Sequence, residues 1–265
     1  MSTFSAFSSA FSSVDPARLV EYLDTTSAGQ RGMKHYMAAA HRGVAADRAV
    51  LDVGCGAGHD VELLTSFGAT AIGVDPSDVM VREAAARAPS APFVRGTGEA
   101  LPFRDGAFAG ARIERVLMHV DDPEAVLAET LRCVEPRGRV SVFEPDWSRY
   151  TVRTDAGDEP AGWLSNARHP EVGGRLWSLL EAVGCDVMDR VEELSVWRTL
   201  AELDQAIGID TAILRAVEAG RISAAGADDW LAHQRERDAH DEFRSTIPKI
   251  LVVAMKRRKD SLRRQ

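Results

Sequence analysis

The stretch Ala49-Val50-Leu51-Asp52-Val53-Gly54-Cys55-Gly56-Ala57-Gly58-His59-Asp60 decides the fold of this chain. A short apolar run leads into glycines at alternate positions, and a helical pattern follows. This order predicts a buried strand, a tight turn and a helix N-terminus, which together form a nucleotide-binding turn. The dinucleotide fingerprint requires its third glycine five residues after the first. Because His59 stands at that position, the spacing favours a more compact ligand that carries adenosine.

Composition excludes several classes of protein. A length of 265 residues allows one large α/β domain with a small accessory region. A net charge of −8 argues against a general nucleic-acid binder. No apolar run approaches the length of a membrane span, and residues 1–13 carry no Lys or Arg, so we expect a cytoplasmic protein without a membrane partner. The spacing of the three cysteines indicates neither a disulfide framework nor a zinc site: Cys55, Cys133 and Cys185.

Strand and helix patterns alternate from residue 49 onward. Repeated units of this kind predict a parallel sheet with helices on both faces, and therefore an α/β fold. We expect strands at 50–53, 71–74, 92–95, 109–113 and 139–143, with helices at about 59–66, 78–88 and 123–134.

The region before the first strand, residues 1–45, has a helical pattern. Asp15-Pro16 predicts a helix start, because an acidic N-cap precedes proline at the first helical position. A second helix is expected over about 28–41. We expect these helices to cap the mouth of the binding site.

The region after residue 143 breaks the alternation. A helix at 172–183 and a long strand at 187–197 are expected, and Ile250–Met255 predicts a last strand. Residues 198–247 are mostly helical in pattern. We expect them to form a lid over the substrate; the alternative is a helical pair that stabilises one edge of the sheet.

Candidate binding residues stand at the ends of successive strands, where open α/β sheets bind ligands. The backbone N–H groups of Gly54 and Gly56 favour a ligand with carbonyl or negative character. Asp52 can face the ammonium of the ligand or can instead bond the N–H groups of the turn. Asp75, with Pro76 beside it, ends the second strand and can accept both ribose hydroxyls; the alternative is an N-cap of the next helix.

Two further segments complete this edge. Thr97 and the backbone of Gly98 can meet the edge of a purine, while Glu99 braces the loop. The segment from Ile113 to Val120 leaves the fourth strand beside the glycine turn. It should therefore face the reactive end of the ligand.

Five motifs follow one another along the chain: Leu51–Gly58, Gly73–Asp75, Gly98–Phe103, Leu117–Pro123 and Leu131–Val140. In their order and spacing, they resemble the Rossmann-like S-adenosylmethionine-dependent methyltransferases, in particular the ubiquinone/menaquinone-biosynthesis and natural-product group. The resemblance implies a seven-stranded sheet with an antiparallel last strand and a methyltransferase domain over 46–265. It also implies that Gly54 lines the methionine part of the cofactor, that Asp75 takes the ribose, and that Glu114 and Arg115 approach the methionine part. That charged pair is unusual. Glu114 and Arg115 can neutralise each other, or Arg115 can pair with the cofactor carboxylate.

The resemblance also implies a candidate for proton transfer. A base is needed only when the acceptor must lose a proton early, as a hydroxyl must. His119 is the candidate base, with Glu144 as its acidic partner and Asp146 as the alternative acid; His119 can instead only brace its loop. No metal is implied, because Asp121 and Asp122 are typical of a helix cap.

The acceptor is predicted to be an apolar or aromatic small molecule with an O-, N- or C-acceptor atom, in secondary metabolism. The rival hypotheses are a cofactor-binding enzyme of this fold that catalyses a cyclisation and a non-catalytic cofactor-binding protein. A monomer or homodimer is expected. The residues expected to bind or cover the acceptor are Tyr22, Asp146, Trp147, Trp163 and Phe243. The alternative is that the aromatic residues among them are ordinary core or packing residues.

Overall fold

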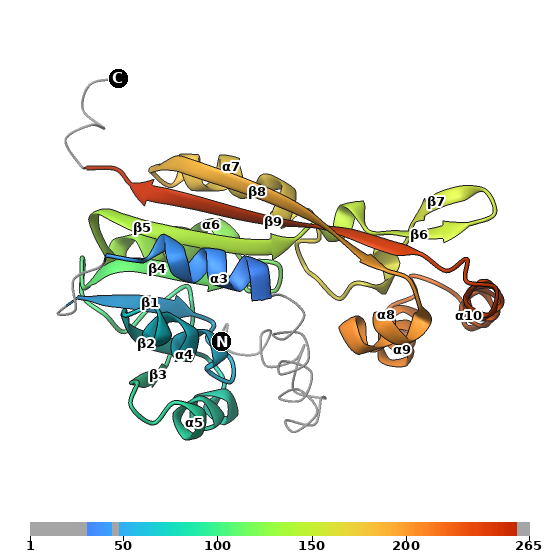
Figure 1. Cartoon of the computed structure of the whole chain (residues 1–265), viewed down its shortest axis with the longest axis horizontal. Coiled ribbons are helices and arrows are strands. Elements are labelled where there is room, and N and C mark those ends of the chain that lie inside the picture. The colour runs from blue at the N-terminus through green and yellow to red at the C-terminus, as the bar shows by residue number, and fades with distance from the viewer. Residues whose placement is uncertain (1–30, 44–47, 259–265) are drawn as a thin grey trace.

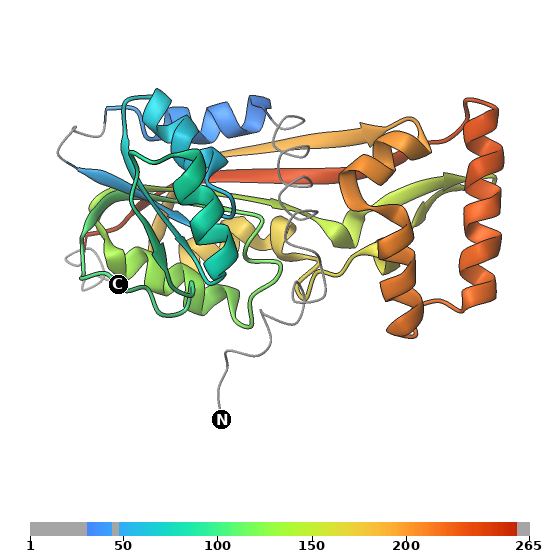
Figure 2. The same ribbon diagram turned by 90° about the horizontal axis from the view of Figure 1, so that it is seen from below.

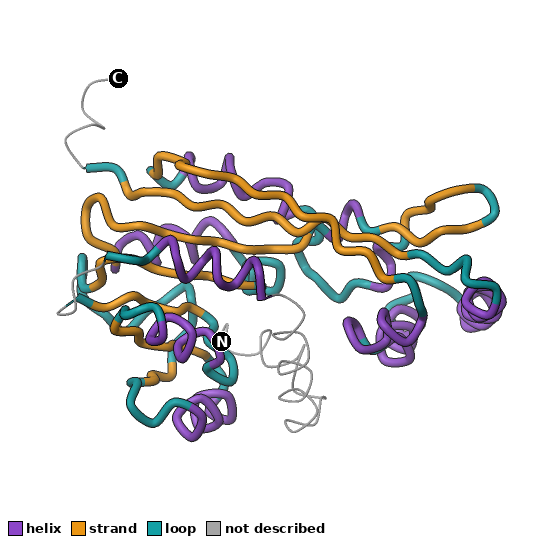
Figure 3. The backbone as a smooth tube through the Cα atoms, viewed as in Figure 1, coloured by secondary structure: helices purple, strands orange, loops and turns teal. Residues whose placement is uncertain are grey.

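The computed structural model describes residues 31–43 and 48–258 (Figure 1). Its strands form one mixed sheet that extends through both ends of an elongated molecule (Figure 3). The strands are β1 (Ala49–Val53), β2 (Thr70–Asp75), β3 (Phe93–Arg95), β4 (Phe108–Glu114), β5 (Val134–Pro145), β6 (Thr151–Thr154), β7 (Gly157–Pro160), β8 (Cys185–Trp197) and β9 (Ser245–Lys256).

Helices cover both faces of this sheet. On the central strands, α3 lies on one face and α7 on the other (Figure 1). The helices are α3 (Arg31–Ala40), α4 (His59–Ser66), α5 (Asp78–Arg87), α6 (Pro123–Cys133), α7 (Val172–Ala182), α8 (Leu200–Ile207), α9 (Ile209–Glu218) and α10 (Ala224–Ala239), with short 3-10 turns η1 (Trp147–Arg149) and η2 (Gly162–Leu164).

The strand order is β3-β2-β1-β4-β5-β9-β6-β7, and β8 pairs with the other side of β9. Neighbours among β1 to β5 are parallel, whereas β9 runs antiparallel to β5 and β8. The predicted α/β class and antiparallel last strand are confirmed. The implied count of seven strands is wrong: among the described residues the sheet has nine, because β6 and β7 add a hairpin. Their sequence is charged and lacks the apolar alternation by which strands are recognised.

Alternation along β9 shows how the two faces are filled. Ile250, Val252 and Ala254 pack with α6 and α7 in the main core. Leu251, between them, packs with Met33 and Met37 of α3 on the other face. A strand buried on both faces has a continuous apolar sequence, which explains why the sequence predicted the last strand.

A smaller lobe extends beyond the central sheet. We call it the distal lobe; it comprises β6, β7, η2, α8, α9 and α10. Figure 2 shows β8 and β9 continuing from the central sheet, here called the sheet lobe, toward these helices, with α10 at the far end. The distal lobe has its own buried cluster, which includes Tyr150, Leu164, Leu203 and Phe243. The predicted helices between the last two long strands are present, and Gly208, at φ +64°, separates α8 from α9.

Of the predicted N-terminal cap, α3 is described, whereas the predicted helix start at Asp15-Pro16 lies outside the described residues. The helix starts at Ser77 and Asp122 follow local rules: each side chain accepts backbone N–H groups of the first turn, and Pro123 follows Asp122. No helix within the described ranges is long and apolar enough to cross a membrane.

Candidate active site

The glycine turn after β1 brings the backbone close to the end of β4. Gly54, Gly56 and Gly58 have φ angles of +72°, +50° and +83°, a region that disfavours residues with a Cβ. A Cβ on Gly54 would collide with Cγ2 of Val116. The N–H of Gly54 donates to the carbonyl of Val74 at 2.8 Å, which ties the turn to β2. The turn is therefore rigid, and position 54 accommodates only glycine.

Asp75 joins the ends of β1 and β2. Its Oδ2 accepts the N–H of Gly56 at 3.0 Å, and its Oδ1 accepts the N–H of Ser77 at 2.9 Å. Burial raises the pKa of Asp75 to about 6, although both N–H groups oppose the rise. Ser77, not Asp75, caps α5, because its hydroxyl accepts the N–H of Met80. The alternative reading of Asp75 as the cap is therefore wrong.

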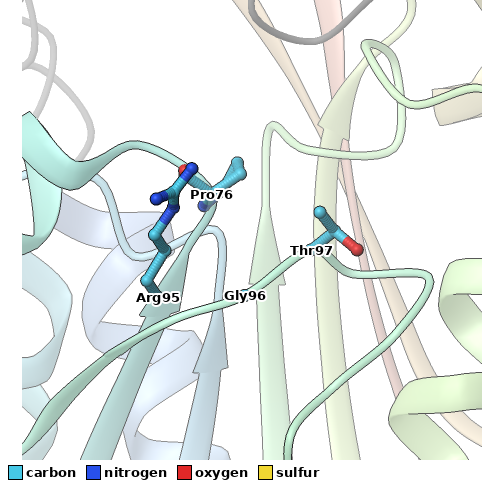
Figure 4. A pocket seen from close by; sticks show the side chains of 4 residues that line it. All are labelled: Pro76, Arg95, Gly96 and Thr97. Carbon is cyan, nitrogen blue, oxygen red and sulfur yellow. The ribbon is translucent and has the colours of Figure 1, made fainter. Parts of the chain in front are cut away.

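A hollow of about 250 Å³ opens beside Asp75, lined by Pro76, Arg95, Gly96 and Thr97 (Figure 4). Pro76 and Thr97, both predicted from sequence, lie on its two sides (Figure 4). Arg95 is an addition: its Nε donates to the carbonyl of Pro76 at 3.2 Å. Next to the hollow, a Cβ on Gly98 would lie 3.0 Å from Cγ1 of Val126, so the loop passes close to α6.

Below the glycine turn lies a buried network of charges from four elements. Arg112 Nη1 is 2.7 Å from Asp60 Oδ2 and 3.4 Å from Asp52 Oδ1, and Nη2 contacts Glu114. Lys34 of α3 reaches the same acids: its Nζ is 2.7 Å from Asp60 Oδ2 and 2.8 Å from Glu114 Oε1. Three carboxylates and two cations thus share one enclosed site.

The network shifts the pKa values of Asp52 and Asp60 in opposite directions. Burial raises the pKa of Asp52, although Arg112 opposes the rise. Burial also disfavours ionisation of Asp60, but the charges of Arg112 and Lys34 outweigh it and hold the pKa of Asp60 below its usual range. Within the described residues, Oδ2 of Asp52 is buried and accepts no hydrogen bond. One buried carboxylate oxygen at the start of the glycine turn therefore has no hydrogen-bond donor among the described residues.

Lys34, Asp60 and Arg112 were not predicted from sequence. Arg112 carried a signal, because an arginine inside an otherwise apolar strand is unusual and it stands two places before Glu114, on the same side of β4. The register also pairs Arg112 with Asp52 on β1. Lys34 had no such signal, because only the tertiary structure brings α3 against β4.

The predicted pair Glu114 and Arg115 lies at the end of β4. Arg115 Nε is 3.6 Å from Glu114 Oε1, but Glu114 is also paired with Arg112 and Lys34. Arg115 has a left-handed backbone at φ +55°, and its N–H donates to the carbonyl of Phe143 at 2.9 Å. This conformation turns the chain sharply into the loop that carries His119.

Glu144 braces that loop. It is fully buried, and its Oε1 accepts the N–H groups of Val116 and Leu117 at 2.8 and 2.7 Å. Burial raises the pKa of Glu144 to about 8. Burial and the charge of Arg115 lower the pKa of His119 to about 4, so its ring is neutral at pH 7. The described contacts make Glu144 a support for the loop, and the catalytic role of both residues stays a prediction.

The residues predicted to bind the acceptor are spread over two places. Asp146 is buried and caps η1 by accepting the N–H of Ser148 at 3.2 Å. Trp147 packs against both the main core and the distal cluster. Phe243 is 3% exposed inside the distal cluster, and Trp163 packs against this cluster. Tyr22 lies outside the described residues. Contact of these side chains with an acceptor stays a prediction.

Asp121 and Asp122 were predicted to form a helix cap rather than a metal site. Oδ1 of Asp122 accepts the N–H groups of Glu124 and Ala125 at 2.9 and 3.0 Å, which confirms the cap. In the described part of the chain, no group of three or more His, Cys, Asp or Glu side chains is arranged to hold a metal ion.

Comparison with known proteins identifies this architecture. A family model described as a methyltransferase domain matches residues 51–142, the segment that contains the glycine turn, Asp75 and the network members other than Lys34. The chain is therefore similar to methyltransferase domains over these residues. It is 35% identical over 77% of its length to an uncharacterized 37.1 kDa protein in a transposon of Streptomyces fradiae. It is 32% identical over 46% of its length to a demethylmenaquinone methyltransferase of Renibacterium salmoninarum.

The chain spans only 61% and 51% of the lengths of these two relatives. Solved structures share its fold at low identity. A geranyl diphosphate methyltransferase in complex with SAM has a TM-score of 0.53 and 17% identity, with 85% of this chain and 84% of that chain covered. The [4+2]-cyclase SpnF has a TM-score of 0.53 and 21% identity, with 84% and 80% covered. One fold thus carries proteins named for different reactions.

Proposed function

We propose that this chain binds S-adenosylmethionine at the carboxyl edge of β1, β2 and β4 and transfers its methyl group to a small molecule. The observation that carries the proposal is the position of Asp75, a buried carboxylate fixed by the N–H groups of Gly56 and Ser77 beside the glycine turn. A carboxylate held in this way has lone pairs left for two adjacent hydroxyls, which is the chemistry of a ribose.

The other residues at this edge fit the rest of the cofactor. The hollow between Pro76 and Thr97 adjoins Asp75 and suits a flat heterocycle. The free Oδ2 of Asp52 suits an ammonium group, and the close approach of Gly54 to Val116 leaves backbone where a side chain would obstruct the ligand. The ribose and both ends of such a ligand therefore find matching groups along one edge.

When bound, the cofactor supplies an activated methyl group on a sulfonium, so the methyl–sulfur bond breaks as the bond to the acceptor forms. The protein then mainly has to position the acceptor and exclude water. His119 stands on the loop beside the glycine turn and is neutral at pH 7, as a base must be. Glu144 positions this loop through Val116 and Leu117.

Residues 198–247 are proposed as the lid over the acceptor, and Tyr22, Asp146, Trp147 and Phe243 as residues that contact it. We further propose a cytoplasmic protein of secondary metabolism that acts as a monomer or homodimer. An acidic net charge of −8 supports a small-molecule acceptor over a nucleic acid.

Calorimetry with S-adenosylhomocysteine tests the binding step. We expect Asp75→Asn to weaken binding by roughly tenfold or more, because a charge-assisted pair of hydrogen bonds is lost. Asp105→Asn is the matched control, since this exposed carboxylate pairs with Arg132 away from the binding edge. Absence of binding to the unaltered chain would contradict the proposal.

Mass spectrometry of products tests the reaction. A panel of phenols, amines and quinones incubated with S-adenosylmethionine should yield a product heavier by one methyl group. A product formed without methyl gain would favour the cyclisation hypothesis instead. Binding without any product from a broad panel would favour the non-catalytic hypothesis.

A further inference from the structure

Lys249 of β9 is a half-buried cation with no assigned role. In the described part of the chain, no hydrogen bond or ion pair to its ammonium is found. A buried lysine is normally paired, because an uncompensated charge loses its hydration on burial. Burial, followed by the charge of Arg115, lowers the pKa of Lys249. The ring of Trp197 and the charges of Glu193 and Glu114 offset part of this desolvation, but no described acid pairs directly with the ammonium.

The sheet directs Lys249 toward the methyl-donor edge. Leu251, two places later on β9, packs with α3, so Lys249 points to this same face. Glu114 also faces α3, since it pairs with Lys34. On β5, Lys249 is in register with Pro145, the residue that follows the loop support Glu144. Glu144 itself faces the opposite side of the sheet, but the charge of Arg115 acts on Lys249, so the ammonium lies near the start of the loop that carries His119.

The same side chain reaches toward the distal lobe. The ammonium of Lys249 lies 6.0 Å from the centroid of the Trp197 ring at the end of β8. Trp197 is half-buried and stacks edge-on against Tyr150, with ring centroids 6.3 Å apart. A flat apolar surface and a cation therefore stand together where the two lobes meet.

The charges around Lys249 favour an anion. Arg115 and Lys249 add two positive charges at this point, and Glu193, in register with Lys249 on β8, is exposed. Glu114, the other acid near Lys249, is already paired with Arg112 and Lys34. A ligand with one negative charge would compensate the charge of Lys249, and an aromatic ring on that ligand would pack on Trp197.

We propose that Lys249 and Trp197 recognise an acceptor whose aromatic ring carries a carboxylate, an inference that rests on the proposed methyltransferase function and names its substrate class. The carboxylate forms an ion pair with the ammonium of Lys249, and the ring packs on Trp197. This places the remainder of the ring toward His119 and the methyl donor.

The test compares acids with their neutral amides: benzoate with benzamide, cinnamate with cinnamamide, and 3-hydroxy-2-naphthoate with 3-hydroxy-2-naphthamide. Binding of each to the full chain saturated with S-adenosylhomocysteine is measured by calorimetry. At least one acid should bind roughly tenfold or more tightly than its amide. Lys249→Met should abolish this preference, and Lys249→Arg should keep most of it because the charge remains.

Two controls separate local from general effects. Arg198→Met removes an exposed positive charge next to Trp197 and should leave the preference for the acid unchanged. Trp197→Phe should weaken the acid and the amide by similar factors. Equal affinity for every acid and its amide, or no binding of any of them, would overturn the inference while binding of S-adenosylhomocysteine still supports the proposed function. Failure of S-adenosylhomocysteine to bind would instead contradict the proposed function itself.

Discussion

At the carboxyl edge of β1 and β2, the surface proposed to face the cofactor consists of glycine backbone and buried carboxylates, whereas the distal lobe is built around aromatic side chains. The first region is fixed by positive φ angles at Gly54, Gly56 and Gly58 and by hydrogen bonds to Asp75. The second buries Tyr150 and Phe243, with four tryptophans packed around them. Backbone geometry tolerates little substitution, whereas an aromatic cluster can be repacked.

Under the proposed function, the contrast separates binding of the methyl donor from binding of the acceptor. A fixed donor site needs one geometry for one cofactor, so it is built from groups that cannot move independently. An acceptor site that varies among related enzymes is better built from side chains on connecting segments. Lys249 and Trp197 stand where these two regions meet, and variants on either side test whether the division holds.

The largest expected effect is on the sheet lobe. Arg112→Met should lower the free energy of unfolding by roughly 3–5 kcal/mol, because it leaves Asp52, Asp60 and Glu114 buried with less compensation. Denaturant titration of the purified chain measures this loss. Arg132→Met, which removes a more exposed pair with Glu129, should cost far less. Equal losses would show that the network does not hold the edge together.

His119 tests whether the loop next to the donor edge carries chemistry. If the ring is the base, His119→Asn should lower kcat roughly 100-fold or more on a hydroxyl acceptor, with unchanged affinity for S-adenosylhomocysteine. Since the pKa of His119 is lowered to about 4, the rate of the unaltered enzyme should rise with pH through about 4 and then stay level. An unchanged kcat in the variant would restrict His119 to bracing its loop.

Glu144 should make the stability of the folded chain fall as the pH rises. Its pKa is raised from 4.5 to about 8, so between these values the folded chain holds a proton that the unfolded chain releases. The stability contributed by this group is present below pH 4.5 and is lost as the pH rises through about 8. Glu144→Gln cannot ionise, so its stability relative to the unaltered chain should increase by up to about 1.4 kcal/mol per pH unit over this window.

The same variant separates two roles of Glu144. The amide oxygen of glutamine can still accept the N–H groups of Val116 and Leu117. A support for the loop should therefore retain activity in Glu144→Gln, whereas an acidic partner of His119 should not. Urea titrations between pH 5 and 8, followed by a rate measurement at pH 7, distinguish the two outcomes.

The smallest expected effect concerns the distal lobe. Phe243→Leu should cost about 1 kcal/mol of stability by loosening the distal cluster. It should raise KM for the acceptor and leave the affinity for S-adenosylhomocysteine within about twofold. Phe108→Leu, equally buried at the start of β4, is the matched control and should affect stability alone. A loss of cofactor affinity in Phe243→Leu would contradict the division between the two regions.

Local patterns predicted much of the sheet lobe because each has a local cause. Asp122 followed by Pro123 predicted a helix start, and the structure confirms it. The apolar run at Ile250–Met255 predicted a strand, since a strand buried on both faces needs no polar positions. The hairpin β6–β7 escaped prediction, because charged residues pair there by backbone hydrogen bonds that leave no hydrophobic pattern.

The sequence by itself determined the glycine turn, the acid at Asp75 and the α/β class, because φ angles, capping and hydrophobic periodicity act between residues close in the chain. Only the tertiary structure decided that Lys34 would meet Asp60 and Glu114, that Glu144 would hold the loop of His119, and that Lys249 would lie between the two lobes. These contacts join residues far apart in the chain. Their geometry depends on the register of β4, β5, β8 and β9, which no local pattern specifies.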